Sequence, residues 1–180
     1  MDIRSTSAQP SLRTLFLWYL LSTGYNVVVR YRIAIWIRSK RIPGSRLIAR
    51  LLLRRLSMYP GVEINCREDV GAGLRIAHAH DIVIGAGARI GRNVTLYNGV
   101  TLGARRYEDA EEGAYDSSRY PIIEDGVTVF SGAKVLGPVT IGKNCIVGAN
   151  SVVLESFPED SVLAGVPARL VRSLKVLPKE

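Results

Sequence analysis

The chain has 180 residues, of which 47% are hydrophobic and 22% are charged. This length suits one domain with a short appendage, and the apolar content is enough for a core, which excludes a disordered chain. The net charge of +8 is uneven, because residues 1–60 contain eleven Lys or Arg residues and one acid, Asp2. The two cysteines, Cys66 and Cys145, are too few for a disulfide framework, so we expect reduced thiols in a cytoplasmic protein.

Three short helices are predicted within residues 1–60. Their apolar runs cover residues 15–21, 27–37 and 47–56, with Gly and Pro residues between them. None of the runs reaches the roughly 18 apolar residues needed to span a bilayer. No small-residue cleavage site follows the first run, so a removable signal peptide is not expected. We therefore interpret residues 1–60 as a basic α-helical N-terminal segment.

The third of these helices is basic and amphipathic. Arg46, Arg50, Arg54 and Arg55 recur beside leucines at helical spacing. Such a helix can lie on an anionic membrane surface, to which each Lys or Arg adds about 1 kcal/mol of attraction. The alternative is a solvated face on helices that only cap the next part of the chain. Without a zinc-ligand set, stacking-aromatic motif or helix-turn-helix signature, nucleic acid is not an expected partner.

A six-residue period dominates the second half of the chain. Its aliphatic positions are Ile64, Val70, Ile76, Ile84, Ile90, Leu96, Leu102, Ile123, Val129, Val135, Ile141, Val147 and Val153. The period fits neither a helix nor a simple strand, and it indicates short strands joined by tight turns. Three such edges make one 18-residue turn of a parallel β-helix, with the aliphatic side chains pointing to its axis. We predict this mainly β fold over residues 61–164.

Two segments depart from the six-residue row. Residues 104–121 are polar, acidic and aromatic by turns, so they cannot form a coil edge. We expect them to project as a loop, and long loops on a rigid scaffold are usually either functional or disordered. Residues 165–180 are predicted to form a basic C-terminal tail.

The two histidines mark the strongest candidate for chemistry. His78 and His80 lie where one hexad stretches from six residues to eight, and an extended corner pushes side chains outward. Glu63 precedes His78 by nearly one coil, so its carboxylate could orient the imidazole for general-base catalysis. A metal site is the alternative, but Asp81 is the only obvious local third ligand.

Residues 62–172 resemble the catalytic domain of the bacterial serine acetyltransferase family, within the left-handed β-helix hexapeptide acyltransferases. The matching motifs lie at residues 62–64, 78–79, 82–85, 100–103, 132–137, 147–154 and 164–169. Their order, with the histidine corner and the terminal Gly-Val-Pro-Ala-Arg, carries the resemblance. The left hand of the coil is also implied by the resemblance, since parallel crossovers in general are right-handed.

The resemblance implies acetyl transfer from acetyl-CoA to an alcohol that is held between subunits of a homotrimer. No metal is expected. His78 falls on the catalytic base of the family, Glu63 on its carboxylate partner, and Ala104 beside the acetyl group, where a backbone N–H can meet the developing oxyanion. The residues that fall near CoA are Ser131, Gly132, Ala149, Pro167 and Arg169.

Several departures from the family pattern bear on the acceptor. Ala77 stands where serine acetyltransferases carry an aspartate, and Tyr120 replaces a histidine after Arg119. Tyr107, Tyr115 and Tyr120 offer flat faces suited to a sugar ring. The chain is thus more similar to the branch that O-acetylates saccharides in capsule or exopolysaccharide synthesis, including the colanic acid acetyltransferases. The glycans of that branch are assembled at the cytoplasmic face of the membrane, so a peripheral membrane contact is also expected.

We therefore predict a saccharide O-acetyltransferase, with Arg119, Tyr120 and Tyr107 at the acceptor. Three alternatives stay open. The first is serine O-acetylation, with Arg119 holding the serine carboxylate. The second is a metal-dependent protein of the γ-carbonic anhydrase type, which would need a third histidine. The third is a non-catalytic trimeric scaffold at the membrane.

Overall fold

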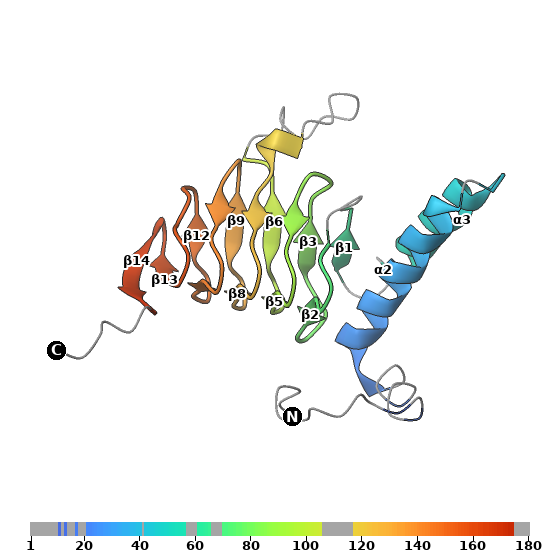
Figure 1. Cartoon of the computed structure of the whole chain (residues 1–180), viewed down its shortest axis with the longest axis horizontal. Helices are drawn as coiled ribbons and strands as arrows, with labels where there is room; N and C mark the ends of the chain where they lie inside the picture. Colours follow the sequence, from blue (N-terminus) through green and yellow to red (C-terminus); the bar gives the residue numbers. More distant parts are fainter. Residues whose placement is uncertain are drawn as a thin grey trace.

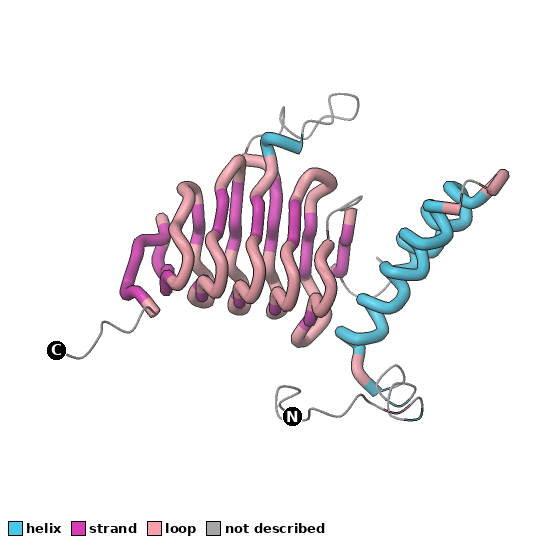
Figure 2. The backbone as a smooth tube through the Cα atoms, in the orientation of Figure 1, coloured by secondary structure: helices cyan, strands magenta, loops and turns pink. Residues whose placement is uncertain are grey.

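The computed structural model describes residues 21–40, 42–56, 61–65, 70–105 and 117–174, with Ser11, Arg13 and Leu17 as isolated positions before them. Its body is a stack of short parallel strands, and two helices lie at the N-terminal end of that stack (Figure 1). Figure 2 shows how short strands and turns alternate along the whole stack. This is the parallel β-helix that the six-residue period predicts.

The two helices are α2 (Thr23–Ser39) and α3 (Ser45–Leu56). Helix α2 begins after Ser22, whose side-chain oxygen accepts a 3.3 Å hydrogen bond from the backbone N–H of Tyr25, as expected for an N-cap. The helices predicted at residues 27–37 and 47–56 are confirmed, and each begins a few residues earlier than its apolar run. The helix predicted at residues 15–21 falls largely outside the described residues.

The strands form three sheets, one on each side of the coil. The β1 sheet contains β1 (Val62–Ile64), β3 (Ile82–Ile84), β6 (Thr101–Gly103), β9 (Lys134–Leu136) and β12 (Val152–Val153). The β2 sheet contains β2 (Arg75–Ile76), β5 (Thr95–Leu96), β8 (Thr128–Val129), β11 (Ile146–Val147), β13 (Ser161–Gly165) and β14 (Ala168–Ser173). The β4 sheet contains β4 (Arg89–Ile90), β7 (Ile122–Ile123) and β10 (Thr140–Ile141).

The strand register shows where the coil departs from 18 residues. Val83 pairs with Thr101, which lies eighteen positions later, as three hexads require. Glu63 pairs with Val83 twenty positions later, and Thr101 pairs with Lys134 thirty-three positions later. Two extra residues therefore sit at the histidine corner and fifteen in the loop, and the strands on either side stay in register.

The core of the β-helix consists of the hexad residues and closes at its N-terminal end on helix α2. All thirteen hexad positions are buried. Val27 and Tyr31 of α2 belong to the same buried cluster. A Cβ added to Gly24 would lie 1.9 Å from the carbonyl oxygen of Ile76, so only glycine permits this approach of helix to strand. Helix α2 thereby covers apolar side chains that the first coil would otherwise expose to water.

The C-terminal end differs from the prediction. Strand β14 runs antiparallel to β13, and Gly165 pairs with Ala168 across the turn. The predicted tail boundary at residue 165 is therefore wrong, because residues up to Ser173 add a strand to the β2 sheet. Of the predicted loop at residues 104–121, the described part is residues 104–105 and 117–121, including the 3-10 helix η3 (Ser117–Arg119). None of the described helices is long and apolar enough to cross a membrane.

Candidate active site

One edge of the β-helix carries His78 and three of the residues predicted to bind CoA. It consists of the corners that lead from the β2 sheet to the β1 sheet, at residues 77–81, 97–100, 130–133 and 148–151, and we call it the histidine edge. Backbone hydrogen bonds stack its corners, from Gly99 N to His80 O (3.1 Å), from Gly132 N to Asn98 O (2.8 Å) and from Asn150 N to Ser131 O (2.9 Å). Residues far apart in the sequence are thus held in a row.

His78 occupies the extended corner of this edge. Its φ of 56° is left-handed, as is that of Asp81 at 54°, and Asn93, Asn144 and Asn150 adopt the same turn conformation at other corners of the coil. The backbone N–H of His80 donates a 2.8 Å hydrogen bond to the carbonyl oxygen of His78, which tightens the corner. His78 is exposed, so its imidazole is accessible from solvent.

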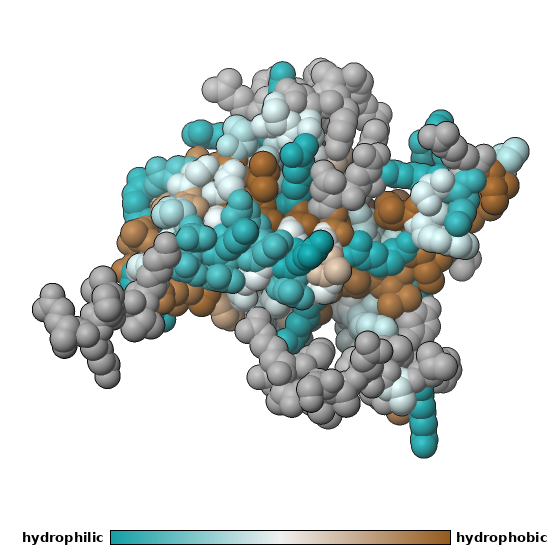
Figure 3. All heavy atoms as spheres, viewed as in Figure 1, coloured by the Kyte–Doolittle hydropathy of each residue, from teal (hydrophilic) through white to brown (hydrophobic). Residues whose placement is uncertain are grey.

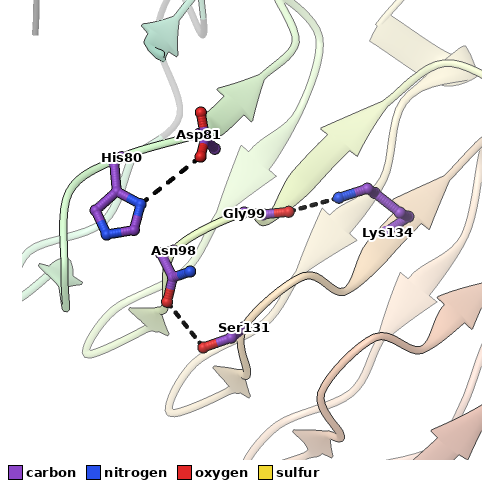
Figure 4. A network of polar contacts seen from close by, with 6 residues as sticks. All are labelled: His80, Asp81, Asn98, Gly99, Ser131 and Lys134. Carbon is purple, nitrogen blue, oxygen red and sulfur yellow. Dashed lines mark hydrogen bonds and ion pairs between the residues drawn. The ribbon is translucent and has the colours of Figure 1, made fainter. Parts of the chain in front are cut away.

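His80 lies on the same corner. Its Nδ1 lies 3.7 Å from Oδ2 of Asp81, and both side chains are largely exposed (Figure 4). An exposed pair at this distance contributes little to stability.

Glu63 lies on β1, where its side chain is exposed and its backbone pairs with Val83. The side-chain amide of Asn65 donates a short hydrogen bond to its carboxylate. Within the described residues, no hydrogen bond joins Glu63 to His78. The carboxylate therefore lies on β1, next to β3, and the histidine corner leads into β3. Its side chain is directed to Asn65, however.

Three of the residues predicted to hold CoA lie on the histidine edge. These are Ser131, Gly132 and Ala149, and the last two have little or no side chain to project from the edge. Ser131 Oγ donates a 2.9 Å hydrogen bond to Asn98 Oδ1 (Figure 4). The edge thus combines small residues with hydrogen-bonding side chains.

Sequence reasoning missed Asn98 and Lys134. Lys134 Nζ donates a 2.6 Å hydrogen bond to the carbonyl oxygen of Gly99, one coil away (Figure 4). A signal for Asn98 does exist, because it precedes Ser131 by thirty-three positions, the displacement that separates paired strands across the loop. Finding it requires knowing that the loop leaves the register unchanged.

Ala104, Arg119 and Tyr120 lie at a different edge, where the β1 sheet turns into the β4 sheet. Ala104 follows β6 directly, and Arg119 ends η3. The ring of Tyr120 is packed so closely that a Cβ on Gly85 would lie 2.6 Å from it, and Tyr120 is only 9% exposed. Tyr107 and Tyr115 fall outside the described residues.

Pro167 and Arg169 belong to the β13–β14 hairpin. Pro167 lies in its turn, and Arg169 lies on β14, where its Nη1 is 2.7 Å from Oε1 of Glu155. Both side chains of this ion pair are more than half exposed, so the guanidinium is accessible to a ligand. Among the described residues, no group of three His, Cys, Asp or Glu side chains could hold a metal ion.

The chain resembles known transferases in sequence and in structure. Residues 120–155 match the model of the bacterial transferase hexapeptide (six repeats). A serine acetyltransferase of Mycobacterium tuberculosis is 35% identical over 93% of this chain and 67% of its own length. A serine acetyltransferase of Helicobacter pylori is 34% identical over 93% of this chain and 92% of its own length.

A solved structure of a serine acetyltransferase in complex with CoA superposes with a TM-score of 0.70 at 33% identity, over 86% of this chain and 60% of that one. Several curated relatives are much longer than the part they share, since the chain spans 57% and 55% of two others. The likeness over most of this chain confirms the prediction of a left-handed β-helix.

The predicted saccharide acceptor is wrong, because the similar proteins are serine acetyltransferases and nothing supports the polysaccharide branch. One argument for it fails, because the packed ring of Tyr120 offers no open face for a sugar. With sequence and structure in agreement, this chain belongs to the serine acetyltransferase family of hexapeptide-repeat transferases.

Proposed function

We propose that the protein transfers the acetyl group of acetyl-CoA to the hydroxyl of L-serine. The observation that carries this proposal is the position of His78, exposed on a left-handed corner of the same edge that holds Ser131, Gly132 and Ala149. The candidate base therefore lies on the same edge as the small residues along which an extended co-substrate can bind. The names of the relatives supply the donor and the acceptor.

In the proposed reaction the neutral imidazole of His78 accepts the proton of the serine hydroxyl while the oxygen attacks the thioester carbonyl. The tetrahedral intermediate then expels the thiolate of CoA, and the imidazolium of His78 returns the proton to that sulfur. One C–O bond forms and one C–S bond breaks, so the reaction balances without an acyl-enzyme or a metal.

Two further residues assist this step. Glu63 stabilises the imidazolium once its carboxylate turns from Asn65 toward His78, a movement that an exposed side chain can make. The backbone N–H of Ala104 donates to the oxyanion of the intermediate. Because Ala104 lies on another edge than His78, we propose that neighbouring subunits of a homotrimer complete each site.

The remaining predicted residues bind rather than react. Arg119 is the candidate partner of the serine carboxylate, which its guanidinium can hold with two parallel hydrogen bonds. Pro167 and Arg169 extend the acetyl-CoA site onto the last hairpin, where Arg169 suits a phosphate group.

The test is thiol release from acetyl-CoA by the purified full chain with L-serine, together with detection of O-acetylserine by mass spectrometry. His78→Asn should lower kcat by about 10²- to 10⁴-fold, because it removes the general base. Glu63→Gln should lower kcat less, since the base itself remains.

His80→Asn is the matched control, because it removes an imidazole two positions away and should leave kcat within a few-fold of the parent. Near-normal turnover by His78→Asn would show that another group is the base. Absence of O-acetylserine with the parent protein would overturn the acceptor and leave the fold unaffected.

A further inference from the structure

The helical pair carries an exposed apolar surface. The exposed large side chains on the two helices and the turn between them are Ile33, Trp36, Ile42, Leu47, Ile48 and Leu51, and we call this set the α2–α3 surface. Trp36 is 60% exposed and Leu47 is 61% exposed. Burying a large aliphatic or aromatic side chain is favourable, so six exposed ones on one helical pair are unusual for a surface with no partner.

Packing within the chain does not use these side chains. Helix α2 contacts the β-helix mainly through Gly24, Val27, Tyr31 and Arg32, and Ile35 also packs against the core. The later part of α2 lies beside α3, and the buried alanines at positions 34 and 49 permit a close approach between the helices. The helical pair projects from the end of the stack (Figure 1), and apolar and polar side chains alternate over it (Figure 3).

The charge of this surface has one sign. The sequence contains no Asp or Glu between Asp2 and Glu63. Arg46 and Arg50 are exposed on α3 beside Leu47 and Leu51. Lys40 Nζ lies 4.6 Å from the centre of the Trp36 ring, so a cation accompanies the largest exposed aromatic side chain.

Apolar side chains with Trp among them and cations around them match one kind of partner. In the interface of an anionic bilayer the aliphatic side chains enter the acyl boundary, Trp sits at the headgroup level, and Lys and Arg reach the anionic headgroups. A second copy of this helical pair would instead bring basic residues against basic residues. We propose that the α2–α3 surface docks the protein peripherally on anionic membranes.

The expected strength follows from the two contributions. Each Lys or Arg near an anionic surface adds about a fivefold gain in affinity, and the gain falls as salt screens the charges. Replacing Arg46 and Arg50 should therefore weaken binding by about 30-fold. Replacing Trp36 and Leu47 by serine should weaken it at least as much, because it removes apolar area that would be buried.

The experiment is co-sedimentation of the full chain with vesicles of phosphatidylcholine containing 30% phosphatidylglycerol or none. Trp18→Phe leaves Trp36 as the only tryptophan, so its fluorescence reports the docking directly. The expected results are binding to anionic vesicles only, loss of binding on adding salt, a blue shift of Trp36 emission, and quenching by brominated lipids.

Two double variants complete the test. Arg46→Gln/Arg50→Gln should lose the binding, whereas Arg92→Gln/Lys143→Gln removes the same charge from exposed positions of the β-helix and should keep it. Equal binding to neutral and anionic vesicles, or no binding to either, overturns the proposal. If the protein does not bind vesicles, and Trp36→Ser/Leu47→Ser lowers the molar mass of its oligomer, the surface is instead an interface with a second copy.

Discussion

Arg32 Nη1 of helix α2 donates a 2.7 Å hydrogen bond to the carbonyl oxygen of Val70, in the first coil of the β-helix. Nη2 of the same guanidinium donates to the carbonyl oxygen of Gly71 at 2.5 Å. One side chain thus satisfies two carbonyls of the first coil, at the end of the β-helix that α2 covers. Charged donors form the stronger class of protein hydrogen bonds, although partial exposure weakens these two.

Arg32→Met should therefore lower the free energy of unfolding by about 1–2 kcal/mol, because it leaves both carbonyls without the guanidinium. Denaturant unfolding followed by circular dichroism measures this change. Arg50→Met, at an exposed position of α3, is the matched control and should fall within about 0.5 kcal/mol of the parent. Equal losses in the two variants would mean that the Arg32 contact adds no stability.

The contact between Gly85 and Tyr120 predicts a coupled pair of substitutions. Gly85→Ala would place a Cβ 2.6 Å from the Tyr120 ring, so the ring must move or the variant is destabilised, by about 1–3 kcal/mol. Tyr120→Ala removes the obstacle, so the double variant should lose clearly less stability than the two single losses added. A thermodynamic double-mutant cycle measures this, and strict additivity would contradict the contact.

Arg169 offers a test of the co-substrate site. Arg169→Gln should raise KM for acetyl-CoA several-fold with kcat nearly unchanged, because it removes a contact made equally in the ground and transition states. Its ion pair with Glu155 is exposed, so the free energy of unfolding should change by less than about 1 kcal/mol. Glu155→Gln is the control that breaks the same ion pair but keeps the arginine, and its KM should not rise.

Cys145 is expected to lower the stability of the fold at alkaline pH. Burial raises the pKa of its thiol above the ordinary value, and hydrogen bonding with Ser161 opposes the rise in part. Since the folded protein holds this proton more tightly than the unfolded chain, the contribution to stability is present at neutral pH. It is lost as the pH rises through and beyond the ordinary thiol pKa of about 8.5.

Unfolding of the parent and of Cys145→Ala between pH 7 and pH 10 tests this. The parent should lose more stability than the variant over the upper part of that range. Cys145→Ala will itself be less stable at neutral pH, because it removes a buried sulfur, so the comparison concerns the slopes. Parallel slopes would show that the thiol is not the group responsible.

The six-residue period predicts the β-helix because each hexad aliphatic, from Ile64 to Val153, must point to one axis. The period gives no information about residues outside the hexad row, so strand β14 and the contact of Arg32 with Val70 and Gly71 could not be predicted from it. His78 was found through the stretched hexad, a local signal. Whether Glu63 reaches it depends on the side-chain rotamer and on Asn65, which spacing does not encode.

The acceptor prediction is wrong for a related reason. The sequence shows Ala77 and Tyr120 only as isolated departures from a motif, whereas the packing of Tyr120 on Gly85 joins residues thirty-five positions apart. Such a contact is visible only once the loop register is known. Sequence reasoning is reliable here for what repeats and weak for what occurs once.

The loop adds fifteen residues to one coil, but β6 still pairs with β9 and β4 still pairs with β7, as they would without it. Each coil of such a stack is stabilised by its immediate neighbours alone, so a change in the length of one corner does not propagate along the axis. Selection can therefore lengthen, shorten or replace this one excursion while the row that carries His78 stays where it is. A new acceptor preference would then arise without a new fold.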